Sequence, residues 1–351
     1  MRKLFPLLVF VALIGCKEKE TEKVILQPIE PVFTSDFTMV FASCSDQERN
    51  QPLWKPIIDN DPDVFIWGGD NVYSDTADMK KMAADYNKVW AHPDYASLAE
   101  KTEIIGTWDD HDYGLNDAGV DWEMKDEAQQ IFLDFLKIAE DDPLRSQKGV
   151  YHTKYYKTPK GSIKVILLDT RYFRSGLNKS TIEGRRYDAW DESNDGTVLG
   201  DAQWAWLKKE LEDETADFNL IVSSIQLLSY EHGWEKWGNF PSEVDKMIAM
   251  VTAAKAKNIL FVSGDRHQAE FSLLYREGFK YPIVDFTSSG MTHVFPDSPT
   301  ENNEYRVMEV VKELNFGLLE FDFDRKKVQM SIRGEGDKVF QSYVQAYPIE
   351  E

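Results

Sequence analysis

Four short apolar runs in this chain end in an aspartate, and this repeated pattern constrains the fold more than any other feature. The runs are VFIWGGD (64–70), EIIGTWDDHD (103–112), KVILLDTR (164–171) and ILFVSGDRH (259–267). A short apolar run bounded by glycine is typical of a buried strand, and open α/β sheets place their ligands at the carboxyl ends of such strands. Aspartate also favours strand ends and turns in general, but four such runs, two of them with a histidine, favour a clustered site.

A further strand-like run, FTMVFASC (37–44), ends in one of the two cysteines of the chain. If a lipid modifies the other, Cys16, then Cys44 has no disulfide partner within the chain. In an exported protein, where thiols oxidise readily, such a cysteine is either a buried small hydrophobe or a metal-bound thiolate. The position of Cys44 at a strand end beside Asp46 favours the metal-bound thiolate.

The amino-terminal residues predict export and lipid attachment. Residues 1–15 read as a signal peptide, with Arg2 and Lys3 before an apolar run that is too short to span a bilayer. The sequence LIGC (13–16) resembles a bacterial lipobox, which implies cleavage before Cys16 and lipidation of its thiol; an ordinary signal peptide with an incidental cysteine is the alternative. Residues 16–35 then predict a flexible tether. We expect a lipid-anchored protein of the cell envelope, in the periplasm, on the outer membrane or at the cell surface.

Apolar spacing divides the rest of the chain, residues 36–351, into the elements of one domain. Helical spacing is found at 75–90, 125–139, 200–211 and 242–257, strands are expected at 219–228, 258–263 and 283–286, and 315–322 with 327–332 predicts a β-hairpin. This order mixes βαβ units with antiparallel strands. It predicts an α/β fold, either one mixed sheet or a sandwich of two sheets flanked by helices.

The charge of the chain restricts its partners. The formal net charge is −21, from 61 acidic and 40 basic residues, which argues against binding to nucleic acid. The same charge repels an anionic substrate at long range. A phosphate site in this chain therefore needs strong local positive charge, and metal ions are its expected source.

The polar residues at the strand ends combine carboxylates, imidazoles, a phenol and a thiol, namely Cys44, Asp70, Tyr73, Asp110, His111, Asp265 and His267. Such a mixture of hard and soft ligands suits two unlike metals better than one. Two adjacent cations bind a phosphate between them, activate an oxygen nucleophile and stabilise the leaving oxygen. Arg171 is expected to grip phosphate oxygens through its planar guanidinium; a salt bridge with Asp169 is the alternative.

Five of these motifs, taken together, resemble a known family. FASC (41–44), GDNVY (69–73), WDDHD (108–112), LDTR (168–171) and SGDRH (263–267) resemble, in the same order, the motifs of the PhoD-like alkaline phosphatases, a branch of the calcineurin-like metallophosphoesterases. The resemblance covers residues 36–295. It implies a four-layer αββα sandwich of two mixed β-sheets flanked by helices, a centre of two or three metals with ferric iron and calcium or other divalent metals, and hydrolysis of phosphate mono- or diesters.

The resemblance also implies roles for single residues. The implied metal ligands are Cys44, Asp70, Tyr73, Asp110, Asp265 and His267. Among them, Cys44 and Tyr73 correspond to iron ligands and Asp70 to the carboxylate that bridges the metals. His111 corresponds to the residue that protonates the leaving group or binds the phosphate. Gln226 lies where the wider superfamily has a further histidine ligand, which makes the second metal site richer in oxygen and more like a calcium site.

Two departures from the family concern access to the site. No small β-domain precedes the FASC strand, and residues 341–351 offer no clear counterpart to the helix that covers the site in some relatives. We expect an alkaline phosphatase or phosphodiesterase that acts on a phosphate mono- or diester, as a monomer attached to the membrane through lipid alone. The alternatives are a phospholipase D-like or wall-polymer phosphodiesterase, and a non-enzymatic metal-binding lipoprotein.

Overall fold

The computed structural model describes residues 33–193, 196–276 and 278–349. The expected signal peptide, the lipidation of Cys16 and the tether up to residue 32 lie outside the described residues and stay predictions. Within the described residues, every helix is too short or too polar to cross a bilayer.

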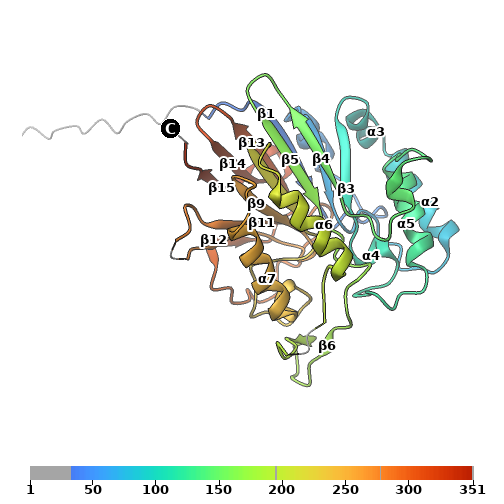
Figure 1. Ribbon diagram of the computed structural model, residues 1–351. Coiled ribbons are helices and arrows are strands. Elements are labelled where there is room, and N and C mark those ends of the chain that lie inside the picture. Colours follow the sequence, from blue (N-terminus) through green and yellow to red (C-terminus); the bar gives the residue numbers. More distant parts are fainter. Residues whose placement is uncertain (1–32, 194–195, 277, 350–351) are drawn as a thin grey trace, which may run out of the picture. The chain divides into compact units, whose positions relative to one another are not determined.

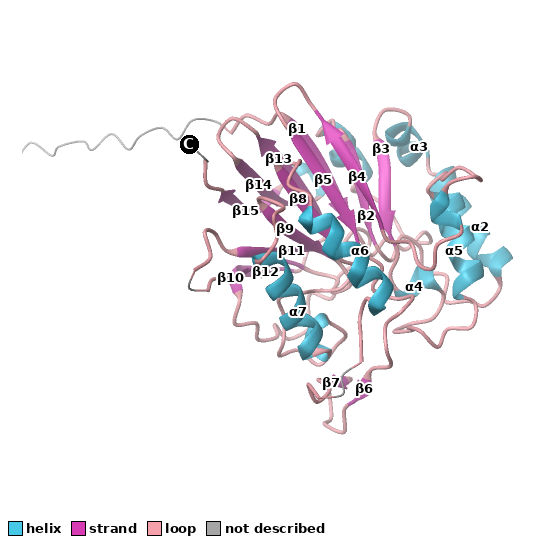
Figure 2. Cartoon of the chain, in the orientation of Figure 1, coloured by secondary structure: helices cyan, strands magenta, loops and turns pink. Residues whose placement is uncertain are grey.

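Two mixed sheets pack face to face and helices cover their outer faces, as Figures 1 and 2 show. The first sheet has the strand order β15 (Val339–Ala346), β14 (Lys327–Arg333), β13 (Phe316–Asp322), β1 (Phe37–Ala42), β2 (Val64–Gly68) and β3 (Glu103–Thr107). The second has the order β12 (Arg306–Val311), β10 (Ala269–Leu274), β11 (Ile283–Ser288), β9 (Ile259–Ser263), β8 (Phe218–Val222), β5 (Ser162–Leu167) and β4 (His152–Lys157). A small hairpin joins β6 (Asn178–Lys179) to β7 (Tyr187–Asp188).

Apolar side chains on both faces of the strands explain this layering. In β1, Met39 and Phe41 point into the core between the sheets, whereas Val40 and Ala42 point toward the helices that cover the first sheet. These helices are α1 (Trp54–Asp59), α2 (Met79–Ala91), α3 (Pro93–Ala99) and α5 (Lys125–Phe135), and α6 (Gly200–Glu212) and α7 (Pro241–Thr252) cover the second sheet. Because strand side chains alternate between faces, a strand that is buried on both sides needs an unbroken apolar run. The expected four-layer αββα sandwich is confirmed.

The parallel strands of both sheets bring their carboxyl ends to the same edge. Strands β1, β2 and β3 are parallel, and so are β5, β8, β9 and β11. The two sheets approach closely there: a Cβ on Gly264 would lie 2.6 Å from Ser43 Oγ and 3.0 Å from the Gly68 carbonyl oxygen. Gly264 is therefore needed for close packing between the strand ends, and this packing concentrates the aspartates in one place.

The structure shifts several predicted boundaries. The helix expected from residue 75 begins at Met79, because the Asp78 side chain accepts hydrogen bonds from the backbone N–H groups of Lys80 and Lys81 and caps it. The helix expected to end at residue 139 ends at Phe135. The strand expected over 219–228 ends at Val222, after which the chain turns toward the site. The predicted β13–β14 hairpin is confirmed, and β15 adds a strand that was not predicted.

Candidate metal centre

Four of the predicted ligand residues have left-handed backbones. The φ angles are 59° at Cys44, 52° at Asp70, 69° at Asp265 and 52° at His267. Residues other than glycine rarely adopt such angles, and where they do the strain often marks a functional site. In this chain the bends come directly after β1, β2 and β9 and direct the side chains toward one another.

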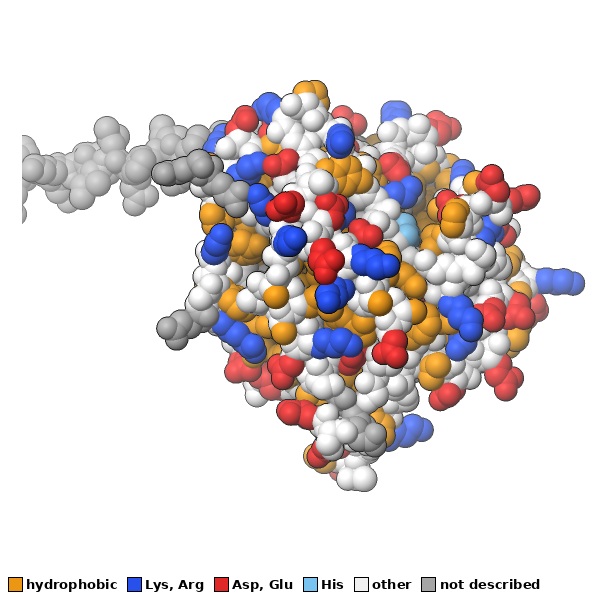
Figure 3. All heavy atoms as spheres, viewed as in Figure 1, with side chains coloured by type: hydrophobic (Ala, Val, Ile, Leu, Met, Phe, Trp, Pro, Cys, Tyr) orange, Lys and Arg blue, Asp and Glu red, His pale blue; other side chains and the backbone are white. Residues whose placement is uncertain are grey.

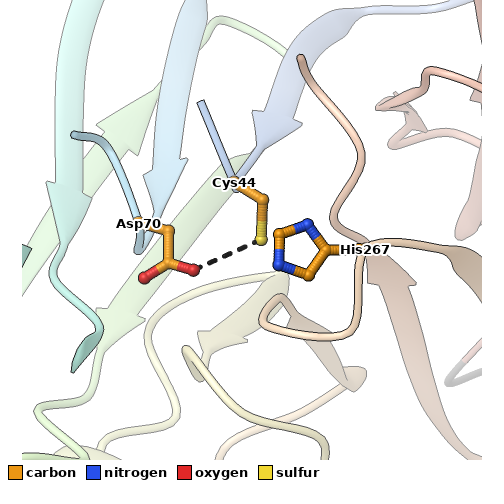
Figure 4. A group of neighbouring side chains, drawn as sticks. All are labelled: Cys44, Asp70 and His267. Carbon is orange, nitrogen blue, oxygen red and sulfur yellow. Dashed lines mark hydrogen bonds between the residues drawn. The ribbon is translucent and has the colours of Figure 1, made fainter. Parts of the chain in front are cut away.

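The thiol, phenol and imidazole side chains gather around one oxygen of Asp70. Cys44 Sγ lies 3.5 Å from Asp70 Oδ2, and the Tyr73 hydroxyl donates to the same oxygen at 3.1 Å. The Tyr73 hydroxyl also lies 3.4 Å from Nε2 of His267. Figure 4 shows Cys44 and Asp70 at neighbouring strand ends with His267 facing them from a loop of the second sheet. Ligand atoms of Cys44, Asp70 and His267 all lie within 4.8 Å of one another, close enough to share one ion.

A second group consists of carboxylates. Ligand atoms of Asp109, Asp110 and Asp265 lie within 4.8 Å of one another, and so do those of Asp70, Asp110 and His111. Asp70 thus belongs to the group with the thiol and to a group with Asp110. This geometry is the one that a carboxylate shared between two metals requires.

Burial and mutual repulsion disfavour the charged forms of Cys44, Tyr73 and Asp265. Burial raises the pKa of the Cys44 thiol well above its usual range, and the charges of Asp70 and Asp265 raise it further. Burial, with the charges of Asp70 and Cys44, also raises the pKa of Tyr73. Burial and the charge of Asp110 contribute to a pKa of about 7 for Asp265. A bound cation would reverse this balance, because it favours thiolate, phenolate and carboxylate.

Asp109 gives independent support for a cation, although the sequence analysis assigned it no role. The Asp109 side chain is fully buried, and Oδ1 accepts a hydrogen bond from Ser224 Oγ at 2.7 Å. Its other oxygen, Oδ2, is buried and has no hydrogen-bond partner among the described residues. A buried carboxylate oxygen without a partner is costly, and a metal ion would satisfy it. The donor set therefore fits bound metal ions.

His111 lies at the border of the carboxylate group and is held by Asp75. Its Nδ1 is 2.7 Å from Asp75 Oδ2, and its ring centroid is 4.2 Å from that of Tyr73. Burial alone would lower the pKa of His111, but the charge of Asp70 and the hydrogen bond with Asp75 raise it to about 11. No sequence signal identifies Asp75, because a single aspartate before a helix has many structural explanations.

The expected role of Arg171 is corrected. Its side chain is fully buried and already engaged in ion pairs: the guanidinium is ion-paired with Asp109 and donates through Nη1 to Glu235 Oε2 at 2.6 Å. The alternative pair with Asp169 is not formed by the side chain either, because Asp169 Oδ1 accepts from the Arg171 backbone N–H at 2.8 Å. Arg171 is better described as a buried counter-charge that orients Asp109.

A second aspartate of WDDHD that the sequence analysis left without a role, Asp112, organises the backbone of the site. Its side chain accepts hydrogen bonds from the backbone N–H groups of Asp109 at 2.6 Å, Asp70 at 3.3 Å and Asn71 at 3.2 Å. Asp112 therefore joins the loops after β2 and β3. The position of a third aspartate in WDDHD was the only sequence signal for this role.

Gln226 and His293 take different positions relative to the centre. Gln226 donates to Glu270 Oε1 at 2.7 Å and Thr287 Oγ1 at 2.9 Å, so its amide nitrogen is engaged in a network away from the ligand cluster. The ring of His293 lies 4.3 Å from that of His267 and 5.0 Å from that of Tyr73, measured between centroids. His293 is thus a half-buried neighbour of the ligands.

A four-layer sandwich with carboxylates, imidazole and thiol at the converging strand ends defines a metallophosphoesterase-like protein. The PhoD-like phosphatase family model matches residues 39–332, and the chain belongs to this family. The expected family is therefore confirmed.

Individual relatives agree with this assignment. Over 280 residues the chain is 23% identical to alkaline phosphatase D of Bacillus subtilis; the match covers 68% of this chain and 47% of that protein, so the chain spans about half the length of this curated relative. A solved structure of PhoD superposes with a TM-score of 0.68 at 14% identity, covering 89% of this chain and 69% of that one. A dimetal phosphatase from Danio rerio gives a TM-score of 0.56 at 11% identity, covering 90% of this chain and 100% of that one. The two solved structures show the shared fold.

Proposed function

We propose that this chain hydrolyses phosphate esters with metal ions held at the converging strand ends. The observation that carries the proposal is the position of Asp70, which lies in one group with Cys44 and His267 and in another with Asp110 and His111. Membership of the PhoD-like phosphatase family supports the same reaction. A phosphate mono- or diester is the proposed substrate.

The two groups of ligands suit unlike metals. Cys44, Tyr73 and His267 would hold a transition metal such as ferric iron, with Asp70 shared, because thiolate and imidazole are ligands of transition metals rather than of calcium. Asp109, Asp110 and Asp265 offer oxygen atoms alone, which suits calcium. When bound, such ions neutralise the phosphate and make an oxygen nucleophile available at neutral pH.

The protein itself supplies a proton donor in His111. In the metal-free chain the charge of Asp70 and the hydrogen bond with Asp75 raise the pKa of His111, and Nδ1 is committed to Asp75. The other nitrogen, Nε2, is then an N–H donor for a phosphate oxygen or for the leaving oxygen of the ester. Asp75 fixes the orientation of the ring, so it acts as a positioning residue.

The place of action proposed here is the cell envelope. Support comes from the signal-like residues 1–15 and from Cys16 at the end of LIGC. A lipid at Cys16 would anchor the chain and favour substrates close to the membrane, such as phospholipid or wall-polymer diesters. We therefore keep a phosphodiesterase as the second candidate function.

The test combines metal analysis with two substrates. The chain is purified, its iron and calcium are measured by elemental analysis, and turnover of 4-nitrophenyl phosphate is compared with that of bis(4-nitrophenyl) phosphate. Stoichiometric metal with turnover of either ester supports hydrolysis, and the faster ester separates phosphatase from phosphodiesterase. A metal-loaded chain that turns over neither ester would instead indicate a metal-binding lipoprotein without this activity.

A further inference from the structure

A cavity lies beside the carboxylate group and is not part of it. The cavity measures about 460 Å³ and is lined by Asn116, Asp117, Lys179, Ser180, Arg186 and Tyr187. Asp117 lines the cavity, and its backbone N–H donates to Asp110 Oδ2 at 2.6 Å. The cavity therefore borders the candidate centre.

The lining of the cavity is cationic. Asp117 is its one carboxylate, and that group already accepts from the Tyr187 hydroxyl at 2.7 Å and pairs with Arg186 Nη1 at 2.9 Å. The Arg186 side chain nevertheless stays 46% exposed, which leaves its other nitrogen donors available. Lys179 is exposed, and within the described part of the chain no ion pair engages it. An unengaged ammonium beside a partly engaged guanidinium is the chemistry that binds anionic groups.

The β6–β7 hairpin, which carries these two cations, is fixed to the body of the protein. The backbone N–H groups of Arg186 and Tyr187 both donate to the Gly233 carbonyl oxygen, at 2.9 Å and 2.8 Å. The Arg186 guanidinium also lies 5.8 Å from the ring of Trp234, within the range of a cation–π contact. Figures 1 and 2 show the hairpin projecting from the end of the sandwich at which β3 and β5 terminate. Arg186 is therefore positioned in advance on the side where the parallel strands end.

Because the whole chain is strongly negative, a cavity with cationic side chains is significant for the binding of anionic substrates. The formal net charge is −21, and the face shown in Figure 3 has acidic and basic side chains interspersed. A substrate with two anionic groups is repelled by this protein unless each group meets local positive charge. Metal ions would bind the first anionic group of such a substrate, and Lys179 and Arg186 are placed to bind the second.

We propose that this cavity binds a second anionic group of the substrate, so that Lys179 and Arg186 select phosphate esters whose alcohol part carries a further phosphate or a carboxylate. The inference rests on the proposed function, because the first phosphate occupies the metal centre.

The test measures binding separately from turnover. The metal-loaded chain is titrated with three non-hydrolysable ligands that share a three-carbon chain: propylphosphonate, 4-phosphonobutyrate and propane-1,3-bisphosphonate. We expect one or both of the doubly anionic ligands to bind about tenfold more tightly than propylphosphonate, which corresponds to roughly 1.4 kcal/mol. A preference for the bisphosphonate alone identifies a phosphate as the second group, and an equal preference for both identifies negative charge as the requirement.

Two variants and a matched control assign the preference to the cavity. Lys179→Gln and Arg186→Gln should each reduce the preference by about two- to fivefold, the range for a partly exposed charge pair. Lys255→Gln removes an exposed lysine from the loop that precedes β9, at the opposite edge of the sheet, and should leave the preference unchanged. Equal affinity of the wild type for the three ligands, or an unchanged preference in both cavity variants, would overturn the inference. If the metal-loaded chain hydrolyses no ester but still binds the doubly anionic ligands more tightly than propylphosphonate, the proposed function is rejected and the anion site in the cavity is supported.

Discussion

Asp75 Oδ2 lies 2.7 Å from Nδ1 of His111, and this contact connects the segment before α2 to the short helix α4 (Asp110–Tyr113). The contact fixes which nitrogen of the imidazole faces the site. It also contributes to the raised pKa of His111 in the metal-free chain and so favours the protonated imidazole. The pair thus supplies two functions that the ligand cluster does not provide: His111 donates a proton, and Asp75 orients the imidazole ring.

His111→Ala should keep most of the metal and lose turnover by about 10²–10⁴-fold, the usual contribution of a general acid. The loss should be larger for alkyl phosphates than for nitrophenyl phosphate, whose leaving group needs little protonation. Asp75→Asn should cause a smaller loss of about 10–100-fold, since one charge-assisted hydrogen bond contributes roughly 1.5–3 kcal/mol. It should also shift the pH–rate profile to lower pH. Equal losses on both ester types would instead make His111 a phosphate-binding residue.

Cys44 and Tyr73 should bind ferric iron and give the protein colour. Thiolate and phenolate ligands both produce charge-transfer bands with iron, so the visible spectrum should change in Cys44→Ala and in Tyr73→Phe. Elemental analysis of the same samples shows whether the iron itself is lost. A spectrum that is identical in the wild type and both variants would contradict this assignment.

Asp70→Asn should lose metal and activity together. Asp70 lies in one group with Cys44 and His267 and in another with Asp110 and His111, and an amide has neither the charge nor the second oxygen of a carboxylate. We expect iron and calcium per chain to fall well below the wild-type values, with turnover near background. Asp126→Asn, on the first turn of α5, is a matched control that should retain both metals.

The metal-free protein should become less stable as the pH rises from 5.5 to 8. Burial raises the folded-state pKa of Asp112 to about 7, and burial with nearby carboxylates does the same for Asp265. The folded state therefore binds more protons than the unfolded state across most of this range, and the free energy of unfolding falls with pH. The raised pKa of His111 acts in the same direction above about pH 6.5. The lowered pKa values of His267 and His293 oppose the trend below that pH, and the lowered pKa of Lys236 opposes it above about pH 7.

Thermal unfolding with and without metal checks this prediction. Because metals bind the deprotonated ligands, the increase in Tm on adding iron and calcium should be larger at pH 8 than at pH 5.5. An increase of the same size at both pH values would show that proton release is not coupled to metal binding at these residues.

Cys16 should carry the lipid and be the first residue of the mature chain. Cys16→Ser should release the protein from membranes or block its maturation. Intact-mass measurement of the membrane fraction gives the mass of the attached lipid and the start of the chain. An unmodified Cys16, or a chain that starts elsewhere, would refute the lipobox assignment.

The sequence alone determined the buried strands and the residues at their ends. Apolar runs such as residues 64–68 are local patterns, and the glycines and aspartates that follow them obey local turn chemistry, so the cluster of Cys44, Asp70, Asp110 and Asp265 was predictable. The unpredicted strands β4, β12 and β15 all lie at sheet edges. Polar residues on their exposed faces interrupt the apolar run, so the local sequence does not indicate a strand. Hydrogen bonding to a neighbouring strand stabilises their extended conformation. Strand β10 is buried within the second sheet, and its apolar pattern was overlooked.

Only the tertiary structure decided how the charged residues pair. Arg171 has the sequence context of a phosphate ligand, yet its partners Asp109 and Glu235 come from segments 62 and 64 residues away. The contact between Asp75 and His111 likewise joins two loops that are distant in sequence, and so does the cavity that Lys179 and Asp117 line together. Side-chain pairs of this kind depend on how two sheets and their loops converge, and local patterns carry no information about that convergence.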